Sequence, residues 1–562
     1  MSAIDPITLE IMRNRLQSIA DEMTASLVRT AYSTNIKDRR DCSCALLTTD
    51  GEVVAQTELG TPFHLGVMPA VVEVVLQHIP IEKMLPGDAV FSNILYPVGP
   101  GHLNDVALVS PIFYKGKIVA LMANQAHHVD VGGFAPGSMA FGVTEIYQEG
   151  LQIPPVKLVK QGAVDQEILA LILQNIRTAS VTRGDIAAQV AANNVGIARL
   201  TEVLDKEGEE LTCRCMEELL DYAERSMRAG IRKIPNGSYA FEDYIEGDGI
   251  IEELVKIRVT IRIKGDSATV DFKGTDKQVK GPMNLRISAA RACTYYVLKC
   301  VIDPELPTNS GAYRPIRVLA EEGTLVNAAF PAALCNANIL TDQRIVDVLL
   351  GAMFQAVPQK VCAACSGEMN LVNIGGINPR TGEYFNYVET YGGGQGAFHC
   401  QDGMDGVQTH LTNTRNAPVE VMEVSYPFRI DRYGLVPDSE GAGEFRGGCG
   451  IEREIVLLGP EAKLSLSADR RKIGPWGVRG GKPAATSDCI VISSDGRKKR
   501  LPSKITTGLK KGDTIRLRTP GGGGWGDPKK RDPHRIEKDV TEEMISADRA
   551  RKIYGYRKGK QK

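Results

Sequence analysis

The segment best able to carry out chemistry is residues 99–130, which reads GPGHLNDVALVSPIFYKGKIVALMANQAHHVD. Two apolar runs in it are separated by Tyr-Lys-Gly, a short glycine-bearing link typical of a β-hairpin. Antiparallel pairing around this link places Asp105 opposite about residue 126 and brings His102 to the same end. His102 and His127 then meet the carboxylate of Asp105 at the open end of one hairpin. Two histidines and one aspartate are the ligand set of an open, catalytic divalent-metal site.

Five His or Asp side chains crowd this predicted hairpin mouth, which favours metal binding over the ordinary hydrogen bonds of loop histidines. They are His102, Asp105, His127, His128 and Asp130. His128 is the alternative to His127 as a ligand, because neighbours on a strand point to opposite faces; we favour His127. His128 and Asp130 are the candidate catalytic residues. They would either transfer a proton or orient His127 without binding the metal themselves.

An Asp-Gly dipeptide at residues 50–51 predicts a second β-hairpin. Asp41 falls at the open end of this hairpin, a position that resembles that of Asp105. Asp41 is therefore the candidate fourth ligand. A salt bridge from Asp41 to Arg39 or Arg40 is the alternative interpretation.

Two further groups of reactive side chains have weaker patterns. The polar segment 402–423, which contains His410, has almost no apolar periodicity, and it predicts either a substrate-orienting loop or a hydrogen-bonded turn network. Of the twelve cysteines, Cys362 and Cys365 have CxxC spacing, but no second pair completes a zinc site. We expect the cysteines to be reduced thiols.

The elements that must position these residues alternate between helix and strand. Asp5-Pro6 is a helix start that leads into an amphipathic helix over 6–31, and a second helix is expected around 68–78. The predicted fold class is α+β with several subdomains: antiparallel hairpins at the metal site, a central helical block and a strand- and glycine-rich C-terminal half.

The predicted boundaries follow these changes of pattern. Residues 1–160 form the metal-site subdomain, 161–235 the helical block, 236–528 the strand-rich part of the same unit and 529–562 a charged tail. The helical block carries no evident chemistry, so it is expected to be scaffold or subunit interface. The tail is expected to be a peripheral helix followed by a mobile end.

The composition is that of an ordinary globular protein. The 562 residues are 43% hydrophobic and 24% charged, enough for roughly two to four domains or subdomains. A net charge of −1 gives no reason to expect nucleic acid or an anionic membrane as a partner. No apolar run is long enough to span a membrane, and the first residues do not follow a signal-peptide pattern, so a cytoplasmic protein is expected.

Several familiar signatures are missing from the sequence. It contains no GxxxxGK[ST] phosphate loop and no strand-linked GxGxxG, so ATP-coupled chemistry would need a partner. It also contains no GxSxG elbow, which favours water activated on a metal over a covalent nucleophile.

At the level of motifs the chain resembles the B subunits of the hydantoinase/oxoprolinase family, which include the ATP-hydrolysing N-methylhydantoinases. The resemblance covers roughly residues 4–528 and rests on a specific combination of segments. They are STNIKDRRDCSCALL at 33–47, GHLNDV at 101–106, AHHVDVGG at 126–133, EIYQEGLQIPPVKL at 145–158, THLTNTRNAPVEVMEVSYPFRI at 409–430 and GGGGWGDP at 521–528.

This resemblance implies a function in a complex. In that family the B subunit works with an A-type subunit that binds and hydrolyses ATP, and related pairs open hydantoins, oxoproline or lactams. The implied ligands of one divalent ion, zinc or manganese, are Asp41, His102, Asp105 and His127. The implied assembly is a heterotetramer of two A and two B chains. Other relatives serve in ketone carboxylases of the acetone or acetophenone type, which is the alternative function.

Overall fold

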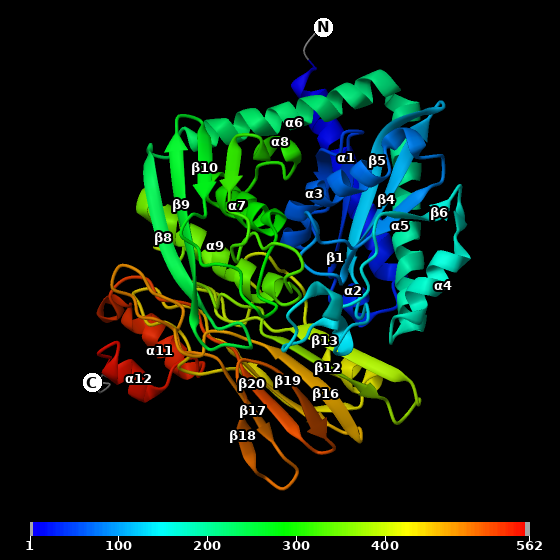
Figure 1. Ribbon diagram of the computed structural model, residues 1–562. Coiled ribbons are helices and arrows are strands. Elements are labelled where there is room, and N and C mark those ends of the chain that lie inside the picture. Colours follow the sequence, from blue (N-terminus) through cyan, green and yellow to red (C-terminus); the bar gives the residue numbers. More distant parts are fainter. Residues whose placement is uncertain (1–3, 557–562) are drawn as a thin grey trace.

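An antiparallel sheet of seven strands carries the predicted metal-binding segments (Figure 1). The computed structural model describes residues 4–556 of the chain. The strands lie in the order β2 (Val53–Gln56), β1 (Cys42–Leu47), β5 (Lys117–His127), β4 (Asp105–Tyr114), β3 (Ala89–Ser92), β6 (Val156–Lys160) and β7 (Ala163–Val164). Because β1 pairs with β5, the two predicted hairpins lie side by side.

Helices cover both faces of this sheet. On one face lie α1 (Pro6–Thr30) and α5 (Ala179–Glu207), and on the other lies α3 (Pro62–His78). Side chains of β1 alternate between the layers, so Leu46 packs toward α1 while its neighbour Leu47 packs against α3. Burial on both faces explains why these strands have continuous apolar runs instead of a polar–apolar alternation.

The hairpin of β4 and β5 is shifted by one residue from its predicted register. Asp105 pairs with His127, not with Ala126. The cause is a β-bulge opposite Ile112 and Phe113, where β5 carries one residue more than β4. The bulge places the side chains of Asp105 and His127 directly opposite each other as a cross-strand pair.

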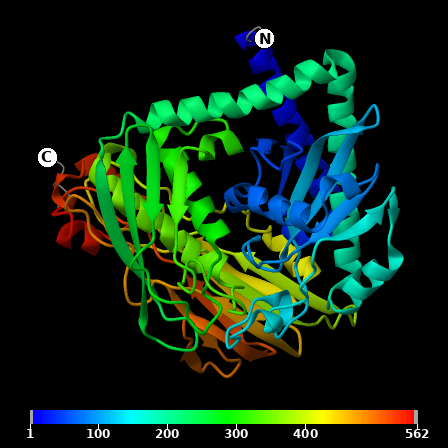
Figure 2. The same ribbon diagram turned by 45° about the horizontal axis from the view of Figure 1, so that its top comes forward.

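The predicted helical block consists of α4 (Gln166–Gln174), α5 and α6 (Glu209–Ile231). The inner face of α5 is not free to bind a partner, because buried Gln189 and Asn193 donate hydrogen bonds to backbone carbonyls of β4. Helix α6 then runs from the N-terminal layers to the next sheet (Figures 1 and 2). The block is therefore structural scaffold on at least this face.

A four-stranded sheet follows in the sequence. Its strands lie in the order β11 (Ile316–Leu319), β10 (Ser267–Asp271), β9 (Leu254–Lys264) and β8 (Gly237–Glu246), with β10 and β11 parallel. Helices α7 (Ile287–Ile302) and α9 (Ala337–Ala356) pack into the largest hydrophobic core of the described residues, between this sheet and α3. Helix α9 is buried along almost its whole length.

The C-terminal half is a sandwich of two antiparallel sheets that share one core. The first contains, in order, β13 (Tyr384–Thr390), β12 (Leu371–Ile377), β16 (Glu461–Ser467) and β19 (Lys504–Lys510). The second contains β14 (Phe428–Leu435), β15 (Ile451–Leu457), β20 (Thr514–Arg518), β17 (Asp488–Ile492) and β18 (Lys498–Arg500). With the helices and the N-terminal sheet, this sandwich confirms the predicted α+β class.

The predicted C-terminal tail contains two helices where one was expected. Helices α11 (Pro533–Thr541) and α12 (Ala547–Lys552) share a small core with Ala442, to which they contribute Ile536 and Ala550. Their apolar contacts hold these helices against the sandwich, and the predicted mobile end falls on residues 557–562, which lie outside the described part of the chain. The remaining short helices are α2 (Thr34–Lys37), α8 (Ser310–Tyr313) and α10 (Val419–Ser425).

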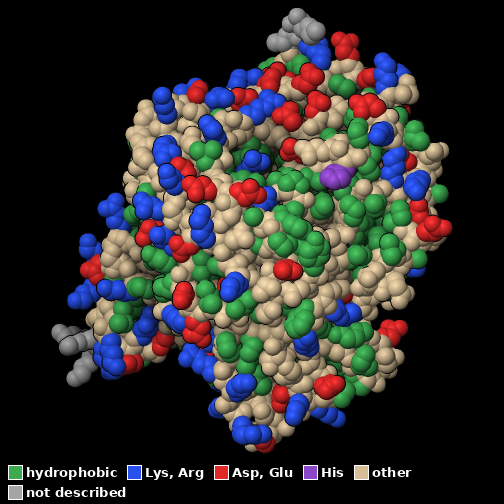
Figure 3. Space-filling view, in the orientation of Figure 1, with side chains coloured by type: hydrophobic (Ala, Val, Ile, Leu, Met, Phe, Trp, Pro, Cys, Tyr) green, Lys and Arg blue, Asp and Glu red, His purple; other side chains and the backbone are tan. Residues whose placement is uncertain are grey.

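The surface in Figure 3 carries acidic and basic side chains interspersed with one another. This mixture agrees with the net charge of −1. None of the described helices combines the length and the apolar character that crossing a bilayer requires.

Candidate metal centre

Three of the predicted ligands meet where the hairpins open. His102 lies in the loop before β4, Asp105 is the first residue of β4 and His127 is the last residue of β5. Nε2 of His102 is 3.2 Å from Oδ1 of Asp105, and the rings of His102 and His127 are 4.7 Å apart between centroids. The donor atoms of all three residues lie within 4.8 Å of one another. All three side chains are buried.

Asp41 lies at the edge of the same cluster, directly before β1. Its backbone carbonyl accepts the N–H of His127 at 3.1 Å, and its Oδ1 accepts the hydroxyl of Thr61 at 3.2 Å. The alternative salt bridge to Arg39 or Arg40 is not formed among the described residues. The guanidinium of Arg39 instead donates to Asn35 and to the carbonyl oxygen of Val388, and the ion-pair neighbour of Asp41 is His64. Asp41 therefore keeps a carboxylate available to the cluster.

His64 is a member of this cluster that the sequence interpretation missed. Its Nε2 lies 3.3 Å from Oδ1 of Asp105 and 3.9 Å from Oδ1 of Asp41. The expected helix around 68–78 in fact begins at Pro62, so His64 occupies its first turn. The available signal was proline at a first helical position, which marks a helix start.

Neighbouring polar groups orient the imidazoles. Nδ1 of His102 donates to the carbonyl oxygen of Cys335 at 3.2 Å, which makes Nε2 the ring nitrogen that faces Asp105. The amide nitrogen of Asn35 lies 2.7 Å from Nδ1 of His127 and also donates to the carbonyl oxygen of that residue. The ring N–H that His102 donates to a carbonyl oxygen is typical of metal-binding histidines. At His127 the amide of Asn35 fixes the ring as a donor to its Nδ1.

The electrostatics of the cluster are dominated by Asp105. Burial opposes its ionisation, but His102 and His64 hold its pKa well below the usual value. Burial likewise disfavours the charged imidazoles, yet Asp105 raises the pKa of both His64 and His102. Burial, together with the neighbouring His102, lowers the pKa of His127 to about 4, so this ring is a neutral donor at physiological pH.

The two predicted catalytic residues lie elsewhere. Nε2 of His128 is hydrogen-bonded to Oε1 of Gln189 on α5 at 2.9 Å, because strand alternation turns this ring away from His127. Asp130 accepts hydrogen bonds from the backbone of Gly132 and from the guanidinium of Arg177. Neither His128 nor Asp130 lines the cavity of the cluster. Their polar contacts are those of residues that hold the fold.

The cluster opens into a cavity of about 40 Å³. This volume has room for an ion and a few water molecules, since one water needs about 10–15 Å³. Beyond the N-terminal subdomain, the wall is made by side chains from the segments that follow α7. They include Asn338, Met369, Val388, Thr390, Leu411, Thr412 and Thr414. The predicted boundary at residue 160 therefore divides the site, which the strand-rich half completes.

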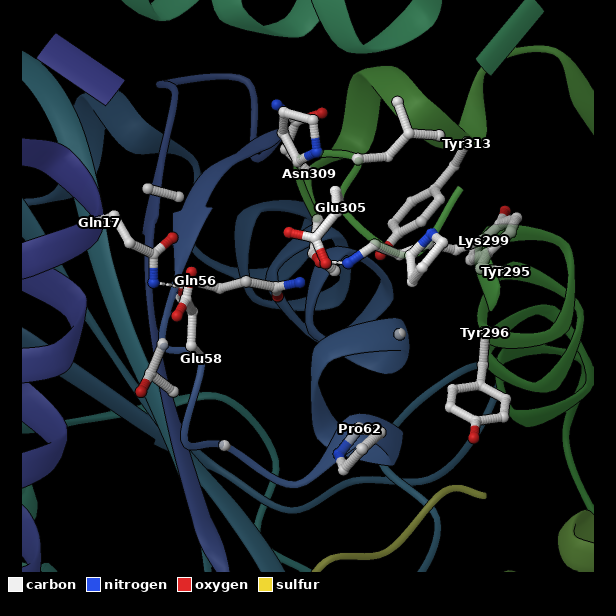
Figure 4. A pocket seen from close by; sticks show the side chains of 18 of the residues that line it. Gln17, Gln56, Glu58, Pro62, Tyr295, Tyr296, Lys299, Glu305, Asn309 and Tyr313 are labelled. Carbon is white, nitrogen blue, oxygen red and sulfur yellow. Dashed lines mark hydrogen bonds between the residues drawn. The ribbon is translucent and has the colours of Figure 1, made fainter. Parts of the chain in front are cut away.

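A larger cavity of about 510 Å³ lies on the other side of a shared wall. Gly60, Pro62 and Asn413 line this outer cavity, whereas Thr61 and Thr412 line the inner one. Its side chains come from elements that are far apart in sequence, as Figure 4 shows. The labelled ones are Gln17, Gln56, Glu58, Pro62, Tyr295, Tyr296, Lys299, Glu305, Asn309 and Tyr313.

The donor set fits a divalent ion. Oδ2 of Asp105 is buried and has no hydrogen-bond partner among the described residues, although the same carboxylate is held ionised. A buried anionic oxygen without a partner is costly unless a cation or water satisfies it. Imidazole nitrogens with carboxylate oxygens suit zinc or manganese, and this mixture does not decide between them.

Comparison with known proteins identifies the family. The sequence profile of hydantoinase B/oxoprolinase matches residues 5–528. An uncharacterized protein of Methanocaldococcus jannaschii is 42% identical over 98% of this chain and 96% of its own length. The B component of a putative D-/L-hydantoinase from a Pseudomonas species is 32% identical over 99% of this chain and 95% of its own length.

Solved structures have the same fold. The ATP-dependent caprolactamase of Pseudomonas jessenii superposes with a TM-score of 0.91 at 31% identity, over 99% of this chain and 96% of that chain. A nucleotide-free acetone carboxylase superposes with a TM-score of 0.92 at 19% identity, over 99% of this chain and 80% of that chain, which shows the fold alone. By its sequence profile and its relatives, the chain belongs to the hydantoinase B/oxoprolinase family.

Proposed function

We propose that this chain is the metal-dependent B subunit of an ATP-dependent cyclic-amide hydrolase. The observation that carries the proposal is the convergence of Asp41, His64, His102, Asp105 and His127 on one buried cavity. The similarity to a hydantoinase component and to a caprolactamase supports an amide ring as the substrate. The proposed partner is an A-type ATPase subunit, because the sequence lacks a phosphate-binding loop.

The residues of this chain have distinct proposed roles. Asp41, His102, Asp105 and His127 hold one divalent ion, zinc or manganese, and His64 is a fifth residue of the same set. When bound, such an ion supplies Lewis acidity, which activates water and polarises a carbonyl oxygen. Asn35 and the carbonyl of Cys335 keep the two histidine rings in place.

The sizes of the two cavities suggest different roles for them in the reaction. A small cyclic amide is too large for the inner cavity of about 40 Å³, but the outer cavity of about 510 Å³ has the size of a small-molecule site. We therefore assign the outer cavity to docking of the ring. Because ring and water must meet in one space for the attack, the wall around Thr61 and Thr412 has to move before the reaction. An amide ring activated by phosphorylation hydrolyses readily in bulk water, and the buried position of the inner site excludes that solvent.

The test is a substrate comparison on the co-purified pair. The chain is co-expressed with its A-type partner, supplied with ATP, and given hydantoins, oxoproline and lactams in one series and ketones with bicarbonate in another. Ring-opened product formed together with ADP supports the proposal. Bicarbonate-dependent consumption of a ketone without ring opening would overturn the proposed hydrolase function and favour the carboxylase function.

A further inference from the structure

A second cluster of metal-binding side chains lies apart from the first. Asp347 belongs to the buried helix α9, Cys365 lies in the segment before β12, and His410 lies in the polar loop 402–423. The side chains of Asp347 and His410 are 0% and 5% exposed, and Cys365 is 1% exposed. Three segments that are distant in sequence thus bring a thiol, an imidazole and a carboxylate together in the protein interior.

The spacing of these groups is that of ligands around one ion. Nε2 of His410 is 3.2 Å from Oδ1 of Asp347, and one donor atom from each of the three residues lies within 4.8 Å of the others. Ligands of a tetrahedral zinc ion, at 2.0–2.3 Å from the metal, are about 3.3–3.8 Å from one another. A small contraction of the cluster would reach that arrangement.

The CxxC pair supplies a fourth donor. Cys362 is 6% exposed, and its thiol is in hydrogen-bonding contact with that of Cys365. The backbone N–H of Gly396 donates to Sγ of Cys365 at 3.4 Å, a contact that stabilises a thiolate. The sequence contains no second CxxC, but Asp347 and His410 take its place in space.

The geometry is held by contacts that leave this donor set intact. Arg470 pairs with Oδ2 of Asp347 at 3.0 Å, so Oδ1 faces His410. His410 itself has φ of 60°, a left-handed conformation that few non-glycine residues adopt. A conformation of this kind persists only where the surroundings fix it, which directs the imidazole to Asp347.

We propose that Cys362, Cys365, His410 and Asp347 bind a second metal ion, which is zinc by the chemistry of the ligands. Thiolates together with imidazole select zinc over manganese or magnesium. Asp347, Cys365 and His410 already lie at ligand spacing, and Cys362 would complete a set of four when the ion enters. Because the ligands are buried, such a site would be closed and structural. Binding replaces the proton of each thiol and any proton held between His410 and Asp347, so protons are released when the ion enters.

The second ion would fix a wall of the first site. Leu411, Thr412 and Thr414 follow His410 directly and line the inner cavity, and the carbonyl of Leu411 accepts the N–H of Phe63 beside His64. The ring of Tyr296, seen in Figure 4, packs 6.2 Å from that of His410 and separates the cluster from the outer cavity. The proposal does not depend on which reaction the first site performs.

Metal analysis of the full chain with its partner tests this inference. We expect two metal equivalents per chain in the wild type and one each in Cys365→Ser and His102→Ala. Cobalt replacement provides a separate readout: a thiolate-to-cobalt absorption band in the near ultraviolet, kept in His102→Ala and lost in Cys365→Ser. The band is specific because the first cluster contains no sulfur ligand.

Cys489→Ser is the matched control, since Cys489 is another buried free thiol in the C-terminal core, and it should keep both equivalents. If Cys365→Ser fails to fold, the metal content of Cys362→Ser and the thiolate band in the cobalt spectrum of the wild type test the second site instead. One equivalent in the wild type, lost entirely in His102→Ala, would overturn the proposal, as would a cobalt spectrum without the thiolate band.

Discussion

The side chains of two adjacent histidines at the end of β5 point in opposite directions. His127 faces Asp105, whereas His128 faces α5 and is bonded to Gln189. From the sequence, the ligand is either of these two histidines but only one of them, because neighbouring side chains on a strand point to opposite faces. The sequence could not decide between them, since the decision depends on which face of the strand α5 covers.

This difference predicts a contrast between two single substitutions. His127→Ala should remove most of the metal from the first site, because it deletes a donor atom from the cluster. His128→Ala should keep that metal and lower stability instead, by about 1–3 kcal/mol for the buried group left unpaired in Gln189. Elemental analysis and thermal unfolding of both variants provide the comparison. Equal metal loss in the two variants would contradict the assignment.

A buried ionic network makes Asp469 the focus of a second prediction at this scale. Its Oδ2 pairs with Arg344 on α9 at 2.9 Å and its Oδ1 with Lys504 on β19 at 2.7 Å, all fully or nearly fully buried. Asp469→Ala would leave buried Lys504 without a carboxylate partner and Arg344 with only the more distant Asp243, at 3.7 Å, which costs about 3–5 kcal/mol.

The measurement is the unfolding midpoint in denaturant. Asp495→Ala is the control, because Asp495 pairs with Arg497 on the surface and should contribute no more than about 1 kcal/mol. A midpoint for Asp469→Ala as high as that of the control would show that the network is not a source of stability.

At the scale of elements, the hairpins were predictable and their exact register was not. The apolar runs and the Tyr-Lys-Gly link locate β4 and β5, because hairpin turns have strong local signals. The bulge opposite Ile112 has no such signal, and it shifts the partner of Asp105 from Ala126 to His127. Local patterns also could not show that α3 brings His64 to the cluster, nor that α9 brings Asp347 to the CxxC pair, since tertiary packing determines both.

The close contact between α3 and α7 leads to a third prediction. A methyl group on Gly66 would lie 2.7 Å from the backbone Cα of Ala292, so the two helices would have to separate. Gly66→Ala should destabilise the protein by about 1–3 kcal/mol through overpacking and displace the first turn of α3, which carries His64.

Thermal unfolding and metal content would both register this change. Gly434→Ala on β14 is the control, because no atom lies within 4 Å of the added methyl group and the backbone there has no positive φ. If the two glycine variants behave alike, the helix contact is looser than the structure indicates.

For the molecule as a whole, we expect a complex with an A-type subunit, most simply two copies of each chain. The sequence predicts this assembly only through the family resemblance, and the structure limits where the partner can bind. The inner face of α5 is occupied by the N-terminal sheet, so the interface must use other surfaces. Co-expression followed by sizing chromatography with light scattering should give a heteromer. A monodisperse monomer that opens the ring without ATP would exclude it.

The most direct test of the account is the metal dependence of ring opening in the co-purified complex. The complex is stripped with a chelator, and product formation with ATP and a cyclic amide is followed as zinc or manganese is added back. We predict that stripped wild type is inactive, that one of the two ions restores product formation, and that His102→Ala stays at least about 100-fold less active at every metal concentration. Ring opening that persists in the stripped complex, or that is unchanged in His102→Ala, would contradict a metal-dependent reaction at this site.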